Sequence, residues 1–127
     1  MIDVTSEYNI YLYTGKVDMR KGIDGLCGLI RSDLGRNPMR PRSIFIFSGR
    51  NPRVKKVLVR EYNRYELTSI RLDEGRFIKP ETDPNKPGGQ IRWSDFKLLT
   101  EASVKGSTAI KYIDESAFNI LIVNKIN

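Results

Sequence analysis

Residues 43–47 read Ser-Ile-Phe-Ile-Phe, and this short run does most to decide the fold. A strand with one face in water alternates apolar and polar residues, whereas a continuous apolar run indicates a strand that is buried on both faces. The loop that follows, residues 49–53, contains a glycine and a proline, which favour turns. The sequence therefore predicts a central strand over 43–47.

Two further strands are predicted downstream, over 54–60 and 65–72, with Glu61-Tyr62-Asn63-Arg64 between them. Asn63 tolerates a left-handed conformation, so the pair is interpreted as a β-hairpin with an exposed turn flanked by basic residues. Tyr62 and Tyr65 could stack on unpaired bases. Cross-strand pairing within the hairpin is the favoured interpretation of both.

Upstream of the central strand, residues 8–13 are rich in strand formers, and Thr14-Gly15 ends them. A helix is predicted over 19–34, capped by Asp18 and stopped by Gly35. Its apolar residues recur at helical spacing, and they are Ile23, Leu26, Cys27, Ile30 and Leu34.

The C-terminal half is less regular. Residues 75–80 are expected to continue the sheet briefly before a polar loop over 81–89. A short helix follows, with Ser94 as N-cap and with Trp93 and Leu98 placed as a hydrophobic staple. Residues 118–126 have a strand-like composition and could add an edge strand or dock on a partner.

These elements together predict a single α+β domain. We expect a mainly antiparallel sheet of about four to six strands, with one long and one short helix packed on one face. Residues 1–102 are assigned to this domain, and residues 103–127 to a C-terminal extension. The residues expected to be largely buried are Leu26, Ile30, Phe45, Phe47, Val57 and Leu67.

Composition excludes several classes of enzyme. The 127 residues contain no histidine, so Ser-His-Asp and Cys-His nucleophile systems and zinc sites with imidazole ligands are ruled out. The single cysteine, Cys27, lies on the apolar face of the predicted helix and is interpreted as an inert core thiol. We therefore expect no catalytic residue, no metal and no cofactor.

Cellular location is inferred from two further features. The first seven residues lack the basic and apolar regions of a signal peptide. The longest apolar run, residues 120–123, is far shorter than the about 20 residues that cross a bilayer. We expect a cytoplasmic protein without a membrane partner.

The net charge of +7 is concentrated in one stretch of the chain. Residues 36–64 hold one acid, Glu61, and nine basic residues, which are Arg36, Arg40, Arg42, Arg50, Arg53, Lys55, Lys56, Arg60 and Arg64. A local excess of this kind attracts polyanions, so nucleic acid is the first partner to consider. Ordinary solvated surface charge is the alternative.

The start of the predicted helix is unusual, because Arg20 and Lys21 lie where the helix dipole is already positive. A bound phosphate would compensate these charges. Glycines at 22, 25 and 28 form one stripe that lets another backbone approach closely. That backbone could belong to this protein's own sheet or to a ligand, and the sequence leaves both open.

Several short motifs occur in an order and spacing that resemble a known family. They are Asp18-Met19-Arg20-Lys21-Gly22, Asp24-Gly25-Leu26, Ile44-Phe45-Ile46-Phe47, Gly49-Arg50, Lys56-Val57-Leu58, Arg71-Leu72, Gly75-Arg76-Phe77 and Pro80. Over about residues 9–101 the sequence resembles the TnpB-type accessory protein encoded by the insertion sequence 66 family. The resemblance implies participation in transposition alongside a separate transposase.

The chain departs from the family pattern at three places. Residues 60–65 read Arg-Glu-Tyr-Asn-Arg-Tyr, where the family usually has a Trp-Asp-Gly-x-Gly-Phe hairpin. Ile70 stands in place of the usual lysine and Lys79 in place of the usual tryptophan.

The sequence thus predicts a non-catalytic accessory protein. We expect it to bind DNA, mainly through phosphate contacts, or to bind the transposase and other proteins of the element, or to do both. No small-molecule substrate is expected. A pure protein-interaction module is the first alternative. A nuclease that uses Asp18, Asp24 and another carboxylate with magnesium is the second. The residues expected to bind DNA or a partner are Arg20, Lys21, Arg50, Arg53, Lys55, Lys56, Arg60, Arg64, Arg71 and Arg76.

Overall fold

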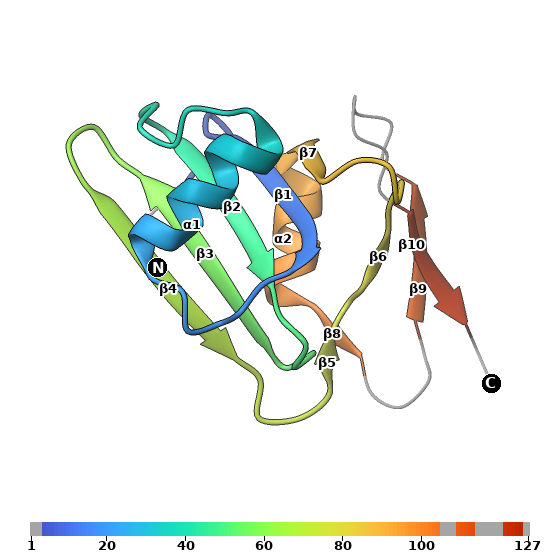
Figure 1. Cartoon of the computed structure of the whole chain (residues 1–127). Coiled ribbons are helices and arrows are strands. Elements are labelled where there is room, and N and C mark those ends of the chain that lie inside the picture. Colours follow the sequence, from blue (N-terminus) through green and yellow to red (C-terminus); the bar gives the residue numbers. More distant parts are fainter. Residues whose placement is uncertain (1–3, 105–108, 114–120, 126–127) are drawn as a thin grey trace.

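The computed structural model describes residues 4–104, 109–113 and 121–125. Its centre is a five-stranded sheet with the order β4-β3-β2-β1-β7 (Figure 1). The strands span Asn9–Lys16 (β1), Ser43–Ser48 (β2), Val54–Arg60 (β3), Tyr65–Arg71 (β4) and Gly88–Ile91 (β7). The predicted strands over 8–13, 43–47, 54–60 and 65–72 are therefore confirmed to within a few residues.

The sheet is mixed but mainly antiparallel. β1 and β2 are parallel, with Tyr11 opposite Phe45, and the other neighbouring pairs are antiparallel. Parallel neighbours need a crossover connection, and the segment that contains helix α1 (Ile23–Leu29) provides it. β7 had not been predicted, because residues 81–89 were expected to form a loop throughout.

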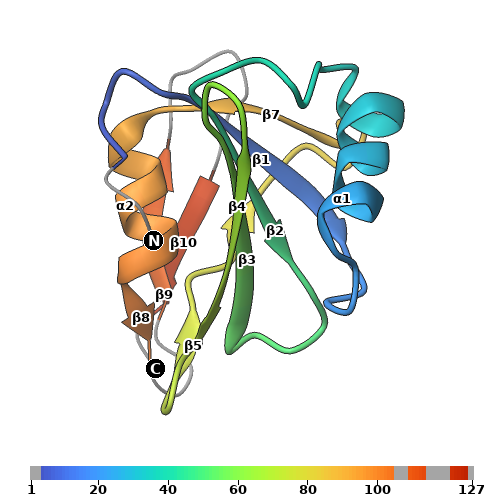
Figure 2. The same cartoon turned by 90° about the vertical axis from the view of Figure 1, so that its left-hand side faces the viewer.

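The two helices lie on opposite faces of the sheet, as Figure 2 shows with the sheet seen nearly edge-on. Leu26 of α1 is in one buried cluster with Phe45 of β2. Phe96 of α2 (Trp93–Glu101) is in the other cluster, with Ile44 of β2. The α+β class is confirmed, but the expected packing of both helices on one face is wrong. A central strand that is apolar on both sides needs a cover on each side.

The predicted core is largely confirmed. Five of its members, Leu26, Ile30, Phe45, Phe47 and Val57, are fully buried. Leu67 is only half-buried, because β4 is the edge strand of the sheet and has a neighbour on one side only.

Helix α1 begins four residues later than predicted. Asp18 caps a turn and not a helix, because its Oδ1 accepts the Arg20 backbone N–H at 2.9 Å. The helix begins after Gly22, widens into a π-helical segment, η1 (Ile30–Leu34), and ends at Gly35, whose φ is 62°. The predicted stop at Gly35 is confirmed. Gly22, Gly25 and Gly28 are exposed, so packing of this stripe against the sheet is not its explanation.

Helix α2 also begins at a different residue from the one predicted. Its N-cap is Arg92, not Ser94, and the backbone N–H of Arg92 donates to the Asp95 carboxylate at 3.3 Å. The residues at the two positions of a hydrophobic staple are then Ile91 and Phe96, which are both buried. The expected Trp93–Leu98 staple is therefore wrong.

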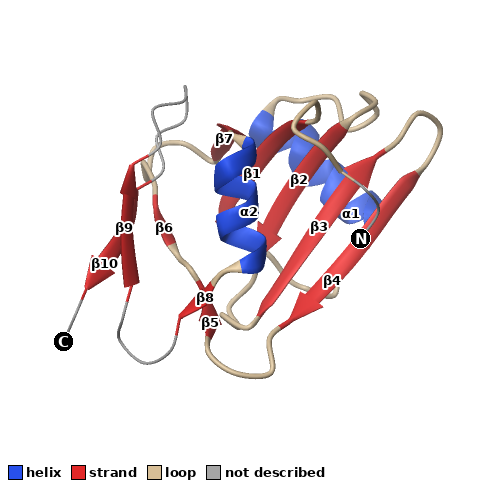
Figure 3. Cartoon of the chain, turned by 180° about the vertical axis from the view of Figure 1, so that it is seen from behind, coloured by secondary structure: helices blue, strands red, loops and turns tan. Residues whose placement is uncertain are grey.

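Short strands lie beside the main sheet (Figure 3). Residues 75–80 do not continue the sheet as expected. β5 (Arg76–Phe77) pairs with β8 (Ser103–Val104), and β6 (Pro80–Glu81) pairs with β10 (Leu121–Lys125), which also pairs with β9 (Ala109–Ile113). The strand predicted within 118–126 is thus found at 121–125, and residues 118–120 and 126 lie outside the described residues.

The β3–β4 connection is a hairpin turn, as predicted, but Asn63 is not left-handed. Among the described residues, Arg42 alone has a positive φ without being a glycine. The turn is closed by the Glu61 backbone N–H, which donates to the Arg64 carbonyl at 2.9 Å. No helix in the described part of the chain is long and apolar enough to cross a membrane.

Candidate nucleic-acid interface

Strand alternation divides the basic residues of the β3–β4 hairpin between the two faces of the sheet. Lys56 and Arg60 share a face with Leu58, which packs toward α1. Lys55 shares the other face with Val57 and Val59, which pack toward α2. Arg71 pairs with Val54 and so lies on the α1 side.

The α1 side of this hairpin carries no acidic residue. The paired positions along it are Val54 with Arg71, Lys56 with Ser69, Leu58 with Leu67, and Arg60 with Tyr65. Arg71 and Arg60 lie at opposite ends of these four pairs, about 20 Å apart along the strands at roughly 3.3 Å a residue. One face of the hairpin therefore presents cations at both ends and in the middle.

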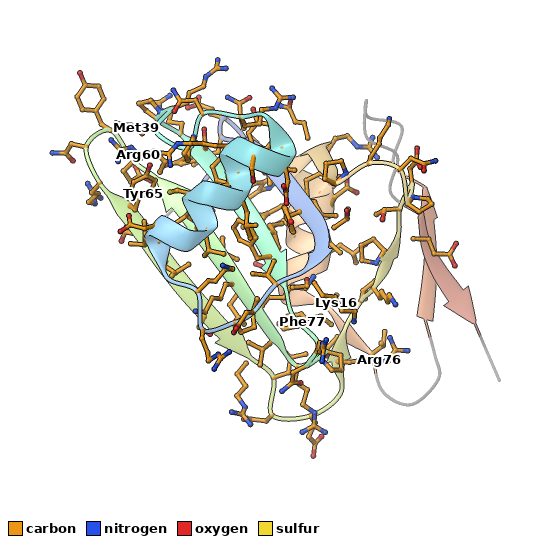
Figure 4. The ribbon with its side chains drawn as sticks, viewed as in Figure 1. Lys16, Met39, Arg60, Tyr65, Arg76 and Phe77 are labelled. Carbon is orange, nitrogen blue, oxygen red and sulfur yellow. The ribbon has the colours of Figure 1, made fainter. Side chains whose placement is uncertain are left out.

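At the turn end of the hairpin, Arg60 packs against an aromatic ring. Its guanidinium carbon lies 4.5 Å from the centre of the Tyr65 ring, at the end of the sheet where Figure 4 also labels Met39. Burial, followed by a hydrogen bond with the Cys27 thiol, raises the pKa of Tyr65. Tyr65 thus confirms the favoured cross-strand interpretation, whereas Tyr62 is 85% exposed and does not.

Arg64 and Lys56 each have one local partner. The exposed Arg64 guanidinium lies 3.7 Å from the carboxylate of the half-buried Glu66. The Lys56 ammonium donates to the Lys21 carbonyl at 3.0 Å, which ties the segment before α1 to the sheet. Lys21 itself is exposed.

The opposite end of the sheet holds the second group of predicted cations. Arg50 and Arg53 lie in the β2–β3 loop, and the Arg53 guanidinium donates to the Asp73 carbonyl at 3.2 Å. Arg76 follows in β5. Figure 4 places Arg76 near Lys16 and Phe77, away from Arg60 and Tyr65.

Arg20 lies near this second group but is paired. Its guanidinium contacts the Asp18 carboxylate at 2.7 Å, and it remains 91% exposed. These hydrogen bonds hold the pKa of Asp18 well below its usual range. Arg20, Lys16 and Arg50 line one shallow hollow together with Asp18. The compensating anion at Arg20 is therefore the protein's own carboxylate.

Lys55 departs from the predicted surface. Its side chain is 3% exposed, and its ammonium lies 5.2 Å from the centre of the Phe77 ring. Burial lowers its pKa to about 8. The expectation that Lys55 forms part of an exposed basic face is wrong, because its position in the strand alternation places it with Val57 and Val59.

Apart from the buried Lys55, the other nine predicted residues fall into three groups. Arg60 and Arg64 lie at the turn end of the hairpin, Lys21 and Lys56 lie in the middle, and the β2–β3 end holds Arg20, Arg50, Arg53, Arg71 and Arg76. Sequence reasoning missed Lys16 and Lys79, which line a pocket with Arg50 and Lys55. Neither belongs to the 36–64 stretch, so its charge excess gave no signal for them.

The nuclease alternative requires acids that converge in space. Among the described residues, no group of three or more His, Cys, Asp or Glu side chains is placed to hold a metal ion. Asp18 is engaged by Arg20, and Asp24 lies exposed in the first turn of α1.

Comparison with known proteins gives a family. The model of the IS66 Orf2-like protein family matches residues 8–107. The uncharacterized protein y4hO of Sinorhizobium fredii is 31% identical over 98 residues, which cover 77% of this chain and 81% of that protein. No solved structure matches. The family description suggests an accessory role in the transposition of an insertion sequence. Over most of its length, the chain belongs to the IS66 Orf2-like family.

Proposed function

We propose that the protein is a non-catalytic accessory factor of transposition that holds DNA through contacts to its phosphates. The observation that carries this proposal is the acid-free set of cations on the α1 side of the β3–β4 hairpin, Lys56, Arg60 and Arg71, which lie around the buried Leu58 that α1 covers. A cation that neutralises a phosphate releases counterions, and this release supplies most of the affinity of sequence-independent binding.

The spacing of these cations matches the spacing of phosphates along a duplex. The about 20 Å between Arg71 and Arg60 corresponds to roughly six base-pair steps at 3.4 Å a step. Arg53 and Arg64 are exposed just beyond the two ends of the paired strands, and they lengthen the row of cations at the edge of the hairpin. Arginine forks contact phosphate oxygens in pairs, so the row positions a duplex without reading its sequence.

The test compares two double variants with equal loss of charge. Arg53→Gln with Arg71→Gln removes two exposed cations at the β2–β3 end of the hairpin. Lys86→Gln with Lys97→Gln removes two exposed cations elsewhere, one in the loop before β7 and one on α2. Affinity for duplex DNA is measured by fluorescence anisotropy as a function of salt concentration.

We expect the first variant to bind all duplex sequences more weakly. The slope of log affinity against log salt concentration should become shallower by about 1.8, because each lost phosphate contact changes it by about 0.9. The control variant should match the wild type. Equal losses in both variants, or no binding by the wild type at low salt, would refute the DNA-binding proposal.

A protein partner is the second candidate, and one observation favours it. Tyr62 and Met39 are the large apolar residues that remain exposed among the described side chains, at 85% and 54%. Met39 lies beside Arg60 at the turn end of the sheet (Figure 4), and Tyr62 belongs to the β3–β4 turn at this end. Aromatic residues, methionine and arginine are enriched in protein interfaces, and the element's transposase is the partner to test by co-purification. Loss of capture by Tyr62→Ser, with no loss by Lys97→Gln, would support this candidate.

A further inference from the structure

A pocket of about 170 Å³ lies at the β2–β3 end of the sheet. Its walls come from the end of β1, the β2–β3 loop, the start of β3 and residues 77–82. A volume of this kind exceeds by an order of magnitude the roughly 10–15 Å³ that one water needs. The pocket therefore has room for a small ligand group.

The charge of the pocket is entirely positive. Four cations, Lys16, Arg50, Lys55 and Lys79, line it, and no aspartate or glutamate does. Uncharged hydrogen-bonding side chains also belong to its lining, namely Ser48, Asn51 and Thr82, whereas the Thr14 hydroxyl in the same lining donates to the Lys86 carbonyl. The pocket can therefore donate to one anion from several directions.

Lys55 is the buried member of this group. Its side chain is 3% exposed, while Lys16, Arg50 and Lys79 are exposed. Within the described part of the chain, the Lys55 ammonium has no hydrogen bond or ion pair, and its contact is the face of the Phe77 ring at 5.2 Å. A buried charge without an acceptor is costly, and a bound anion would remove that cost.

The fold fixes Lys55 in this position. It lies opposite Ser48 of β2 and Ile70 of β4, on the middle strand of the β2-β3-β4 ladder and near its β2–β3 loop end. The neighbouring Gly49 is buried, and a Cβ there would come within 3.0 Å of the Val17 carbonyl. The loop that bears Arg50 is therefore packed tightly against the segment after β1, next to the pocket.

We propose that this pocket binds a phosphate group, with Lys55 at its base and with Lys16, Arg50 and Lys79 at its rim. A phosphate suits this site better than a carboxylate does, because two negative charges on a tetrahedral group match several cations that approach from different sides. The group could be a free phosphate or the terminal phosphate of a nucleic acid. Phosphates inside a duplex backbone are linked on both sides, which keeps them from entering a buried site.

The first experiment uses inorganic phosphate alone, so it does not depend on the proposed DNA binding. Phosphate is titrated into the full chain in a buffer without other oxyanions, with ionic strength held constant by chloride, and binding is followed by calorimetry and by backbone amide shifts. We expect saturable binding, with shifts at Thr14, Ser48 and Asn51. Lys55→Met should weaken binding about tenfold or more, and the control Lys97→Met should not.

A second variant covers the possibility that Lys55→Met does not fold. Lys16→Gln with Lys79→Gln removes two exposed rim charges and should weaken phosphate binding several-fold while the fold is kept. The proposal is overturned if the wild type shows no saturable phosphate binding. It is also overturned if affinity is unchanged in whichever of these variants fold.

The second experiment identifies the source of the phosphate. Oligonucleotides with a 5′-phosphate or a 5′-hydroxyl compete with inorganic phosphate for the pocket. Preferential competition by the 5′-phosphate form supports binding of a nucleic-acid end, and equal competition supports binding of free phosphate. Arg53 and Arg71 do not line the pocket, so their variant reports on the duplex face alone and the two proposals can fail separately.

Discussion

Lys55→Met should stabilise the protein at neutral pH when no anion is bound. The usual lysine pKa is 10.5, and burial lowers that of Lys55 to about 8. Each pKa unit corresponds to about 1.4 kcal/mol, so the folded state carries a penalty of about 3 kcal/mol for keeping this ammonium charged. Methionine fills a similar volume without a charge, and it loses the contact with Phe77, which offsets about 1 kcal/mol of the gain. A net gain of about 2 kcal/mol is expected at pH 7.

The sign of the pH dependence follows from the lowered pKa. Below about pH 8 the Lys55 side chain is charged in both the folded and the unfolded protein, and the penalty is fully present. Between about pH 8 and 10.5 the unfolded chain binds the proton more tightly than the folded one, so the stability of the wild type rises with pH relative to the variant. The two stabilities should therefore approach each other above pH 10.

The assay is urea unfolding of both proteins at pH 7, 8, 9 and 10 in phosphate-free buffer. Trp93 is the single tryptophan, and it stacks on the buried Phe96 at 5.4 Å between ring centres, so its fluorescence reports unfolding. Subtracting the curves cancels the other titrating groups, which the two proteins share. A variant that is less stable than the wild type at pH 7, with a difference that does not change up to pH 10, would show that the buried charge carries no penalty.

Three further predictions follow from the described side chains. Leu26→Ala should cost about 2–5 kcal/mol in urea unfolding, because Leu26 is fully buried between α1 and the sheet; a loss below 1 kcal/mol would contradict this packing. Asp33→Asn should lower the pKa of Tyr13 from about 12, where burial and then the hydrogen bond to Asp33 hold it, and an unchanged ultraviolet titration would show that this bond does not form in solution. Purified protein with magnesium should leave supercoiled DNA uncut on a gel; cleavage that Asp18→Asn abolishes would restore the nuclease alternative.

The sequence predicted those strands whose own residues and flanking turns indicate a strand. β2, β3 and β4 combine apolar runs with turn residues, and their expected ranges were nearly correct. β7 has the sequence Gly-Gly-Gln-Ile, which has little strand propensity, and it forms because β1 offers a free edge to pair with. A Cβ at Gly88 would collide with the Leu12 carbonyl. The glycine that disfavours a strand in the sequence is therefore what permits close approach in the structure.

The candidate site likewise has one part that the sequence could predict and one part that it could not. The position of Lys55 was within reach of the sequence, because it alternates with Val57 and Val59 and belongs to their face. A count of charges along the chain ignores that alternation and assigns every lysine to the surface. The pocket was out of reach, because it joins Lys16, Arg50 and Lys79 from three separate segments, and only the fold brings these together.

The pairing of β1 with β7 constrains the order in which the chain can fold. β2, β3 and β4 are joined by short connections, so they can form a meander from local contacts alone. The contact of Ile10 with Ile91 closes a loop of about 80 residues, whose entropic cost is met only after other contacts are in place. During synthesis, the apolar edge of β1 stays without its partner until residue 91 has left the ribosome, and this interval is when the nascent chain is most exposed to aggregation.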